Sequence, residues 1–192
     1  MLDLPDVLME LTRKAKLLRA FRLAAPYPTA AYVQTEWRTL VAQRIVSGAM
    51  EVQRVEIVYG LPRLQEIVSN IIRYDGLKYA AKVYCSATSD VVPAMGGYMF
   101  DNDEFLLGAY WTGLPPTNKP GLRMASEPFA TFFSAYWSEI WSRGMPVNLR
   151  GKHDLSKVQE IAFELGLDAV RWPEFVEEAR TLEIGDGAPP LI

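Results

Sequence analysis

The stretch from residue 52 to residue 85 constrains the fold more than any other part of the sequence. It contains two apolar runs, 52–59 and 79–85, with the length and composition of strands that are buried in a sheet. Between them, residues 62–74 carry apolar side chains at helical spacing, and Gly76 follows as a helix-ending residue. A strand–helix–strand unit predicts two parallel strands joined by a right-handed crossover, and hence an α/β fold.

The flanking segments extend this unit into a mixed sheet with helices around it. We expect an amphipathic, basic helix over 5–24 and a second helix over 35–49, because apolar residues recur there at helical spacing. Two short apolar runs, 97–100 and 105–110, enclose acidic and amide residues that favour a turn, so they predict a β-hairpin. An aromatic helix is expected over 128–143.

We divide the chain into three parts on this basis. Residues 1–26 form an N-terminal helix, residues 27–150 form the α/β domain, and residues 151–192 form a small, acidic, helical C-terminal appendage. The appendage is expected to contain two short helices that are separated near Pro173, since proline disfavours helical geometry in the residue before it.

Composition excludes several classes of protein. Hydrophobic residues make up 49% of the chain and charged residues 22%, which is typical of a globular protein. The net charge of −3 gives no global attraction to nucleic acid or membrane. The single cysteine excludes an internal disulfide, and no apolar run is long enough to cross a membrane. Because the first residues also lack the pattern of a signal peptide, we expect a cytoplasmic protein.

The order of strand, helix, strand, hairpin and aromatic helix resembles a phospholipase-D-like half-domain. Active members of that family carry His-x-Lys, then Asp after four residues, then Gly-Ser-x-Asn after six more. Aligning the family aspartate with Asp101 places the family glycine on Gly108 with the same spacing. The His, Lys, Ser and Asn positions then fall on Ala94, Gly96, Ala109 and Trp111. The resemblance covers roughly residues 35–143.

The resemblance implies a scaffold that has lost its chemistry. The family reaction uses a histidine nucleophile, and its lysine and asparagine residues hold phosphate oxygens. Ala94 and Gly96 supply neither a nucleophile nor a cation, so covalent catalysis and charge stabilisation are both lost. We therefore assign no catalytic residue, no metal ligand and no cofactor.

A less polar cleft remains as the candidate ligand site. Its expected residues come from the family positions and from the aromatic side chains near them: Ala94, Gly96, Asp101, Tyr110, Trp111 and Trp137. A small organic or sugar-like molecule would suit an aromatic wall of this kind. The alternative interpretation is that the rings of helix 128–143 simply pack against the sheet.

Other residues admit a functional and a structural interpretation. His153, the one histidine of the chain, is expected in an exposed loop rather than at a catalytic centre. Asp101, Asp103 and Glu104 could bind a divalent cation, or they could be solvated turn residues. Cys85 ends an apolar strand and is expected to pack in the core.

The expected partners are a second copy of the chain or another protein, and a small-molecule ligand. Nucleic acid could be bound through basic residues near the N-terminus, although the same residues fit the solvated face of a packed helix. These are Arg13, Lys14, Lys16, Arg19 and Arg22. The sequence contains no convincing helix-turn-helix motif, and no membrane partner is expected.

Three functions follow from this reading. The first is a non-enzymatic module for ligand sensing, dimerisation or regulation, linked to transcription, because degenerate half-domains that look like this one occur in transcription regulators. The second is a nuclease-like or phosphodiesterase-like hydrolase that reuses the cleft, with Asp101, Glu127, Lys82 and Arg123 as candidates. The third is a structural subunit of a larger assembly.

Overall fold

The computed structural model describes residues 4–22, 35–85, 97–108, 121–149 and 152–182. The helices in these ranges are α1 (Leu4–Lys14), α2 (Thr35–Val46), α3 (Leu61–Arg73), α4 (Glu127–Arg143), α5 (Leu155–Glu164) and α6 (Trp172–Thr181). The strands are β1 (Leu17–Arg22), β2 (Glu51–Val58), β3 (Tyr79–Cys85), β4 (Gly97–Phe100), β5 (Glu104–Gly108), β6 (Gly121–Met124), β7 (Met145–Leu149) and β8 (Lys152–His153).

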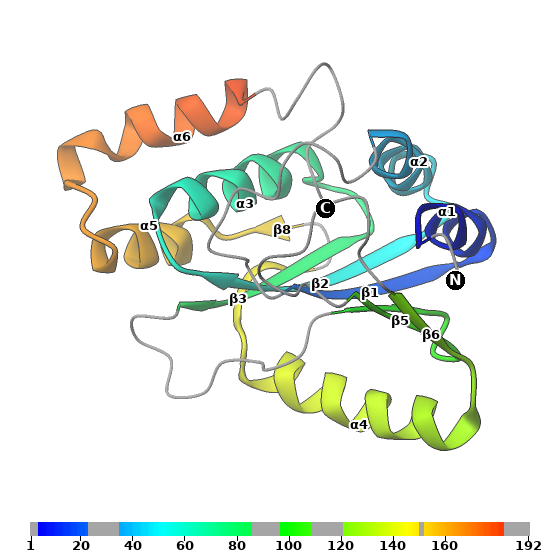
Figure 1. Cartoon of the computed structure of the whole chain (residues 1–192). Coiled ribbons are helices and arrows are strands. Elements are labelled where there is room, and N and C mark those ends of the chain that lie inside the picture. The colour runs from blue at the N-terminus through cyan, green and yellow to red at the C-terminus, as the bar shows by residue number, and fades with distance from the viewer. Residues whose placement is uncertain (1–3, 23–34, 86–96, 109–120, 150–151, 183–192) are drawn as a thin grey trace.

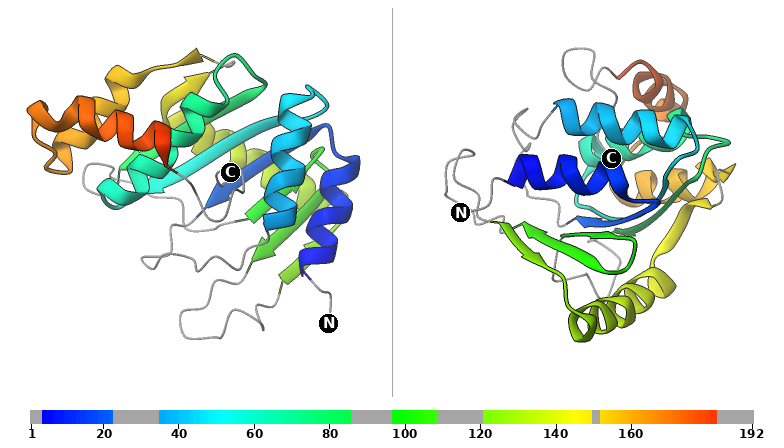
Figure 2. Two further views of the ribbon diagram at one scale, coloured as in Figure 1. Left: turned by 90° about the horizontal axis from the view of Figure 1, so that it is seen from above. Right: turned by 90° about the vertical axis from the view of Figure 1, so that its right-hand side faces the viewer.

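All eight strands belong to one mixed sheet with the order β6-β5-β4-β1-β2-β3-β7-β8. Helix α4 crosses one face of the sheet, and the other helices lie on the opposite face (Figures 1 and 2). The architecture is therefore α/β with a mixed sheet and helices on both faces, which confirms the expected α/β class, whereas the phospholipase-D-like half-domain stays a prediction. No described helix has the length and apolarity needed to cross a membrane.

The central strands β1, β2 and β3 are parallel to one another. The predicted strand–helix–strand unit corresponds to β2, α3 and β3, and its boundaries agree with the prediction to within one residue. Val52 lies between Leu18 and Tyr79 in the sheet, and all three side chains are buried. The periodic burial of α3 against these strands explains why this unit could be predicted from its apolar pattern.

The expectation of one helix over residues 5–24 is wrong. The helix ends at Lys14, and β1 begins at Leu17 between β2 and β4. Leu18 is completely buried in that position, so tertiary pairing outweighs a local spacing that also fits a helix. The N-terminal segment therefore supplies a central strand of the same sheet, and the basic residues of 13–22 do not share one helical face.

The predicted hairpin is confirmed, because β4 and β5 pair antiparallel with Phe100 opposite Glu104. Its turn contains Asp101 and Asn102, whose φ angles are 51° and 74°. Aspartate and asparagine tolerate this left-handed region better than most residues, which is why these two types mark the turn. Three short strands, β6, β7 and β8, extend the two edges of the sheet and were not predicted.

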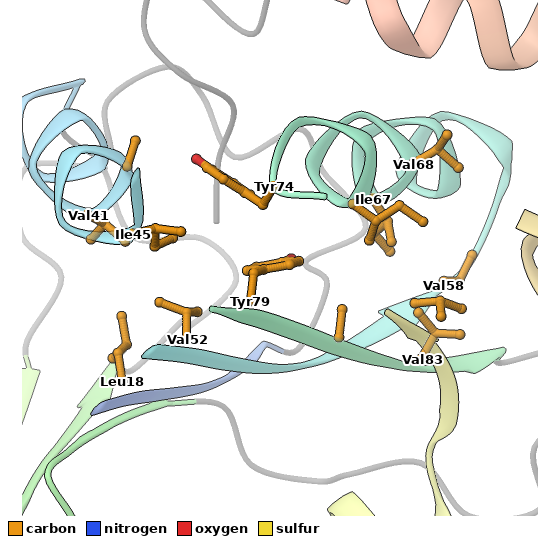
Figure 3. Packing of buried hydrophobic residues seen from close by; sticks show 14 of the residues in the cluster. Leu18, Val41, Ile45, Val52, Val58, Ile67, Val68, Tyr74, Tyr79 and Val83 are labelled. Atoms are coloured by element: carbon orange, nitrogen blue, oxygen red, sulfur yellow. The ribbon is translucent and has the colours of Figure 1, made fainter. Parts of the chain in front are cut away.

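Two hydrophobic clusters fill the two sides of the sheet. The larger cluster lies between the sheet and helices α1, α2, α3, α5 and α6. Figure 3 shows the part of it where α2 and α3 face the central strands. The smaller cluster lies under α4, where Phe105 stacks on Phe133 with ring centroids 3.4 Å apart. Each large apolar side chain that is fully buried in this way stabilises the fold by about 2 kcal/mol.

The two expected tail helices are present as α5 and α6. Pro173 stands in the first turn of α6 rather than between the helices, a position where the missing N–H costs nothing. Val158 and Ala179 are completely buried in the larger cluster, so both helices contribute to the main core. A hydrogen bond of 2.7 Å from Gln65 Nε2 to Glu178 Oε2 also joins α6 to α3.

Candidate ligand-binding site beside helix α4

The structure describes two of the six residues expected in the cleft, Asp101 and Trp137. Ala94, Gly96, Tyr110 and Trp111 lie outside the described residues, so their placement in a cleft stays a prediction. The two described residues come from the β4–β5 turn and from the middle of α4.

The carboxylate of Asp101 has a defined structural role. Its Oδ1 accepts hydrogen bonds of 2.8 Å from the backbone N–H groups of both Lys16 and Leu17. The N–H of Asp101 in turn donates to the carbonyl oxygen of Leu17 at 3.0 Å. These three bonds join the hairpin turn to the first residue of the central strand β1.

Asp101 lies in the turn of the β4–β5 hairpin. The start of β4 and the end of β5 form the open end of the hairpin, on the opposite side from the turn. Gly97, the first residue of β4, pairs with Leu107 near the end of β5. Four residue steps along an antiparallel strand separate Gly97 from Asp101, or roughly 13 Å. The seven positions from Asp101 to Gly108 therefore correspond to a hairpin whose turn carries the aspartate and whose open end carries the glycine.

Trp137 is buried, with 3% of its surface exposed, and it lies between α4 and the sheet. Its ring stacks on that of Trp141, one helical turn later, with centroids 5.4 Å apart and planes inclined by 21°. Spacing of four residues places both indoles on one side of the helix. Trp141 is partly exposed, so the stack runs from the core to the surface.

Arg19 of β1 lies on the same side of the sheet as this indole stack. Its guanidinium carbon is 5.9 Å from the centroid of Trp137, within the range of a cation–π interaction. Its Nε donates to Gln53 Oε1 at 3.1 Å, and its Nη1 donates to Asn102 Oδ1 in the hairpin turn. Burial lowers the pKa of Arg19, and the charge of Glu51 acts in the opposite direction.

Lys82 of β3 stands at the other end of the stack. Its Nζ is 5.1 Å from the centroid of Trp141 and donates to the carbonyl oxygen of the same residue at 2.5 Å. Partial burial lowers the pKa of this amine. Arg19 thus lies next to Trp137, Trp137 stacks on Trp141, and Trp141 lies next to Lys82. We call these four residues the cation–indole row.

The close approach of α4 to β3 depends on Gly144, the residue that ends the helix. A Cβ atom there would lie 3.0 Å from Cβ of Lys82 and 3.3 Å from Cε2 of Tyr84, closer than ordinary contact. The hydroxyl of Tyr84 donates to the carbonyl oxygen of Ile140 at 2.6 Å. Gly144, Tyr84 and Lys82 together fix the end of α4 against β3. These contacts also fix the position of the cation–indole row.

A second polar cluster, buried on the opposite face of β2, was missed by sequence reasoning. Arg54 and Glu56 are 1% and 2% exposed and form an ion pair, which Arg63 of α3 extends at 2.5 Å from Glu56. Tyr79 hydrogen-bonds to Arg54, and burial raises the pKa of this tyrosine. The sequence did contain an indication of this cluster. Side chains alternate between the two faces of a strand, so Arg54 and Glu56 lie on the same buried face as Val52 and Val58.

The residues proposed for a rebuilt hydrolase site have separate partners. Arg123 of β6 forms bonds of 2.6 and 2.9 Å with the two oxygens of Glu104. Lys82 donates to the end of α4, Asp101 accepts from the start of β1, and Glu127 is exposed in the first turn of α4. Nothing in the described part of the chain joins these four side chains into one constellation.

The remaining candidates, His153 and Cys85, each have a structural environment that accounts for them. His153 of β8 pairs with Asp75 at 2.8 Å, between Nδ1 and Oδ1. Cys85 is buried, as expected from its apolar strand. Within the described ranges, no group of three or more His, Cys, Asp or Glu residues is arranged to hold a metal ion.

The N-terminal basic residues are distributed over two elements. Arg13 and Lys14 end α1, where Lys14 pairs with Glu10 at 2.7 Å, whereas Arg19 points to the α4 side of the sheet from β1. Lys16 is exposed between the two elements. The single basic helical face that was expected is therefore replaced by a basic helix end and one cation in the row.

Comparisons with known proteins give a likeness at the level of the fold. Neither a family model nor a curated protein matches the chain. The chain is similar to TrmBL2, an archaeal chromatin protein with a novel mode of DNA binding, at a TM-score of 0.50 and 10% sequence identity. The match covers 72% of this chain and 48% of TrmBL2, so the chain spans about half the length of that protein.

Proposed function

We propose that this chain is a non-enzymatic regulatory module that binds a ligand on a scaffold resembling a phospholipase-D-like half-domain. Its task would be linked to transcription or to the organisation of nucleic acid. The proposal rests on the side chains of the site, because one fold can support many activities.

The observation that carries the proposal is the engagement of Asp101. Asp101, the residue aligned with the family aspartate, accepts hydrogen bonds at Oδ1 from two backbone N–H groups at the start of β1. A carboxylate that holds a strand in place is a scaffold group, and Ala94 and Gly96, at the positions of the family histidine and lysine, carry no reactive side chain. The similarity in fold to a chromatin protein that binds DNA is consistent with a regulatory setting.

A hydrolysis assay tests the proposal directly. The purified 192-residue chain is incubated with a phosphodiester substrate, with and without Mg²⁺ or Mn²⁺, and compared with the Asp101→Ala variant. We expect wild-type protein and variant to be equally inactive. Metal-dependent cleavage that disappears in Asp101→Ala would overturn the proposal and favour the hydrolase.

A second candidate task is dimerisation, which the exposed side of α4 favours. Phe132 is 55% exposed although it is a large aromatic residue. Small or weakly polar residues recur at exposed positions every three or four residues near it, at Pro128, Thr131, Ala135, Ser138 and Ser142, and the exposed Glu139 forms an ion pair with Arg143. A helix side of this kind can approach another helix closely, with Phe132 as the side chain that enters the facing surface.

The charges of α4 indicate its partner, which we propose is α4 of a second copy in antiparallel orientation. The helix carries Glu127 in its first turn and Arg143 in its last turn. An antiparallel pair centred on Ala135 places Glu127 of each copy opposite the arginine of the other. This arrangement also aligns the two helix dipoles favourably.

A further inference from the structure

We propose that the cation–indole row binds a phosphate group attached to a planar base, that is, a nucleotide unit of a free nucleotide or of a single strand. The proposal rests on the proposed function, because it names the ligand class of a non-enzymatic module. Phosphate would lie against Arg19 or Lys82, and a base would stack on the partly exposed ring of Trp141. Aromatic rings with flanking cations are the combination that binds single strands without strong sequence preference.

The charges of the row favour an anion. Among the described residues, no carboxylate oxygen lies within 4.0 Å of a side-chain nitrogen of Arg19 or Lys82, whereas Arg54, Arg63 and Arg123 each form an ion pair. Both cations are partly buried, and burial removes water that would otherwise stabilise their charge. An incoming phosphate would replace part of that lost stabilisation.

The charge of Glu51 leaves this preference for an anion in place. Glu51 acts electrostatically on Arg19, but its carboxylate accepts a hydrogen bond of 2.7 Å from Gln53 Nε2 and is exposed to water. Water screens an exposed carboxylate more strongly than it screens a half-buried cation. At the Lys82 end of the row, the amine meets a ring and a backbone carbonyl.

The dimensions of the row suit a short strand. Successive separations along it are 5.9 Å from Arg19 to Trp137, 5.4 Å between the two indoles and 5.1 Å from Trp141 to Lys82. The row crosses from β1 to β3, and the carbonyl and hairpin contacts of its two cations fix their positions. Two phosphates of one strand could therefore reach the two cations, with the indole stack between them.

Binding is measured by fluorescence anisotropy of a labelled oligothymidylate of about twelve nucleotides, which exceeds the length of the row. The whole 192-residue chain is titrated into this strand, into the same length of duplex DNA, and into the strand with thymidine monophosphate as competitor. We expect binding to the single strand, with log K falling with log salt at a slope of about −1.4 for two phosphate contacts. Competition by the mononucleotide would indicate that a free nucleotide suffices.

Two variants test the residues, and a third is the control. Lys82→Met and Arg19→Gln are each expected to weaken binding about tenfold at low salt and to reduce the slope to about −0.7. Lys78→Met is the matched control, because Lys78 also donates from Nζ to a backbone carbonyl, that of Gly48, but lies outside the row. It is expected to bind like the wild type.

A readout in the wild-type protein covers the case in which a variant does not fold. Stacking on Trp141 should quench tryptophan fluorescence as the unlabelled strand is added. The proposal is overturned by absence of strand binding, by an unchanged affinity in folded Lys82→Met, or by binding without quenching.

The same mixtures are examined on a gel after incubation with Mg²⁺. Shortened oligonucleotide would contradict the non-enzymatic function, whereas an intact but unbound strand would contradict the ligand alone.

Discussion

Asp101 and Leu17 are hydrogen-bonded to each other in both directions. The N–H of Leu17 donates to Asp101 Oδ1 at 2.8 Å, and the N–H of Asp101 donates to the carbonyl oxygen of Leu17 at 3.0 Å. The two residues are 84 positions apart in the chain. A turn between two antiparallel strands thereby fixes where the central parallel strand begins, which gives Asp101 a testable structural role.

Replacement of Asp101 by alanine should destabilise the fold by about 2 kcal/mol, because two backbone donors lose a charged acceptor. Asp101→Asn keeps an oxygen at the same position and should cost less than half as much. The free energy of unfolding from urea titration measures both. Asp103→Ala is the control, because Asp103 is an exposed residue of the same turn. It should change the free energy of unfolding by less than about 0.5 kcal/mol. Equal losses at 101 and 103 would contradict the role of Asp101.

Gly144→Ala should destabilise the protein by about 1–2 kcal/mol, because a new methyl group must displace Lys82 or Tyr84. The contact of 3.0 Å with Cβ of Lys82 involves an atom near the backbone, which cannot swing aside. Gly60→Ala is the control, since a Cβ there meets nothing closer than 3.9 Å. Thermal unfolding compares the two. An unchanged melting temperature for Gly144→Ala would show that α4 does not rest closely on β3.

Neutralising the buried ion pair should be costly. Glu56→Gln leaves Arg54 without its buried counter-charge and should lower stability by about 3 kcal/mol. Adding Arg54→Met to that variant removes the uncompensated cation, so the double variant should recover part of the loss. A double-mutant cycle in urea gives the coupling energy. A double variant less stable than Glu56→Gln would mean that Arg54 acts through contacts other than this pair.

The strand–helix–strand centre of the fold could be predicted because its apolar pattern has a single interpretation. Burial of α3 follows helical spacing, and β2 and β3 are mostly apolar, with Arg54 and Glu56 as the exceptions on the β2 face that α3 covers. Strand β1 could not be recognised in the same way. Leu18 and Phe21 also fit the helical spacing that begins in α1, and only pairing with β2 and β4 distinguishes the two structures.

The candidate site was predictable in part, for a related reason. The aromatic side of α4 was evident in the sequence, and Trp137 does lie on it. The cations of the row come from β1 and β3, which are more than sixty positions apart, and no local pattern brings them together. Arg54 and Glu56 were missed because charged residues are seldom buried, although their parity in β2 matched the buried face.

Tyr74 should govern part of the alkaline stability of the protein. Its side chain is 1% exposed beside Tyr79, with ring centroids 5.1 Å apart (Figure 3), and burial raises the pKa of Tyr74 to about 12. Between about pH 10 and pH 12 the unfolded chain loses this proton while the folded chain keeps it. The stability contributed by the neutral phenol is therefore complete below pH 10 and falls by about 2–3 kcal/mol as the pH approaches 12. Urea unfolding at pH 7, 10 and 11 should show a smaller alkaline loss in Tyr74→Phe than in the wild type, and an identical pH profile would contradict the assignment.

The exposed side of α4 makes a prediction about assembly. If α4 pairs with α4 of a second copy, Phe132→Glu should convert a dimer into a monomer, because a buried carboxylate would replace the central ring of the contact. Val170→Glu is the control: Val170 is 86% exposed on a different surface, and its replacement should leave the mass unchanged. Sedimentation equilibrium gives both masses.

The antiparallel orientation has its own test, since Glu127→Arg should weaken the dimer and the added change Arg143→Glu should restore it through exchanged charges. A monomeric wild type would contradict the contact, and failure of the second charge reversal to restore the dimer would contradict the orientation.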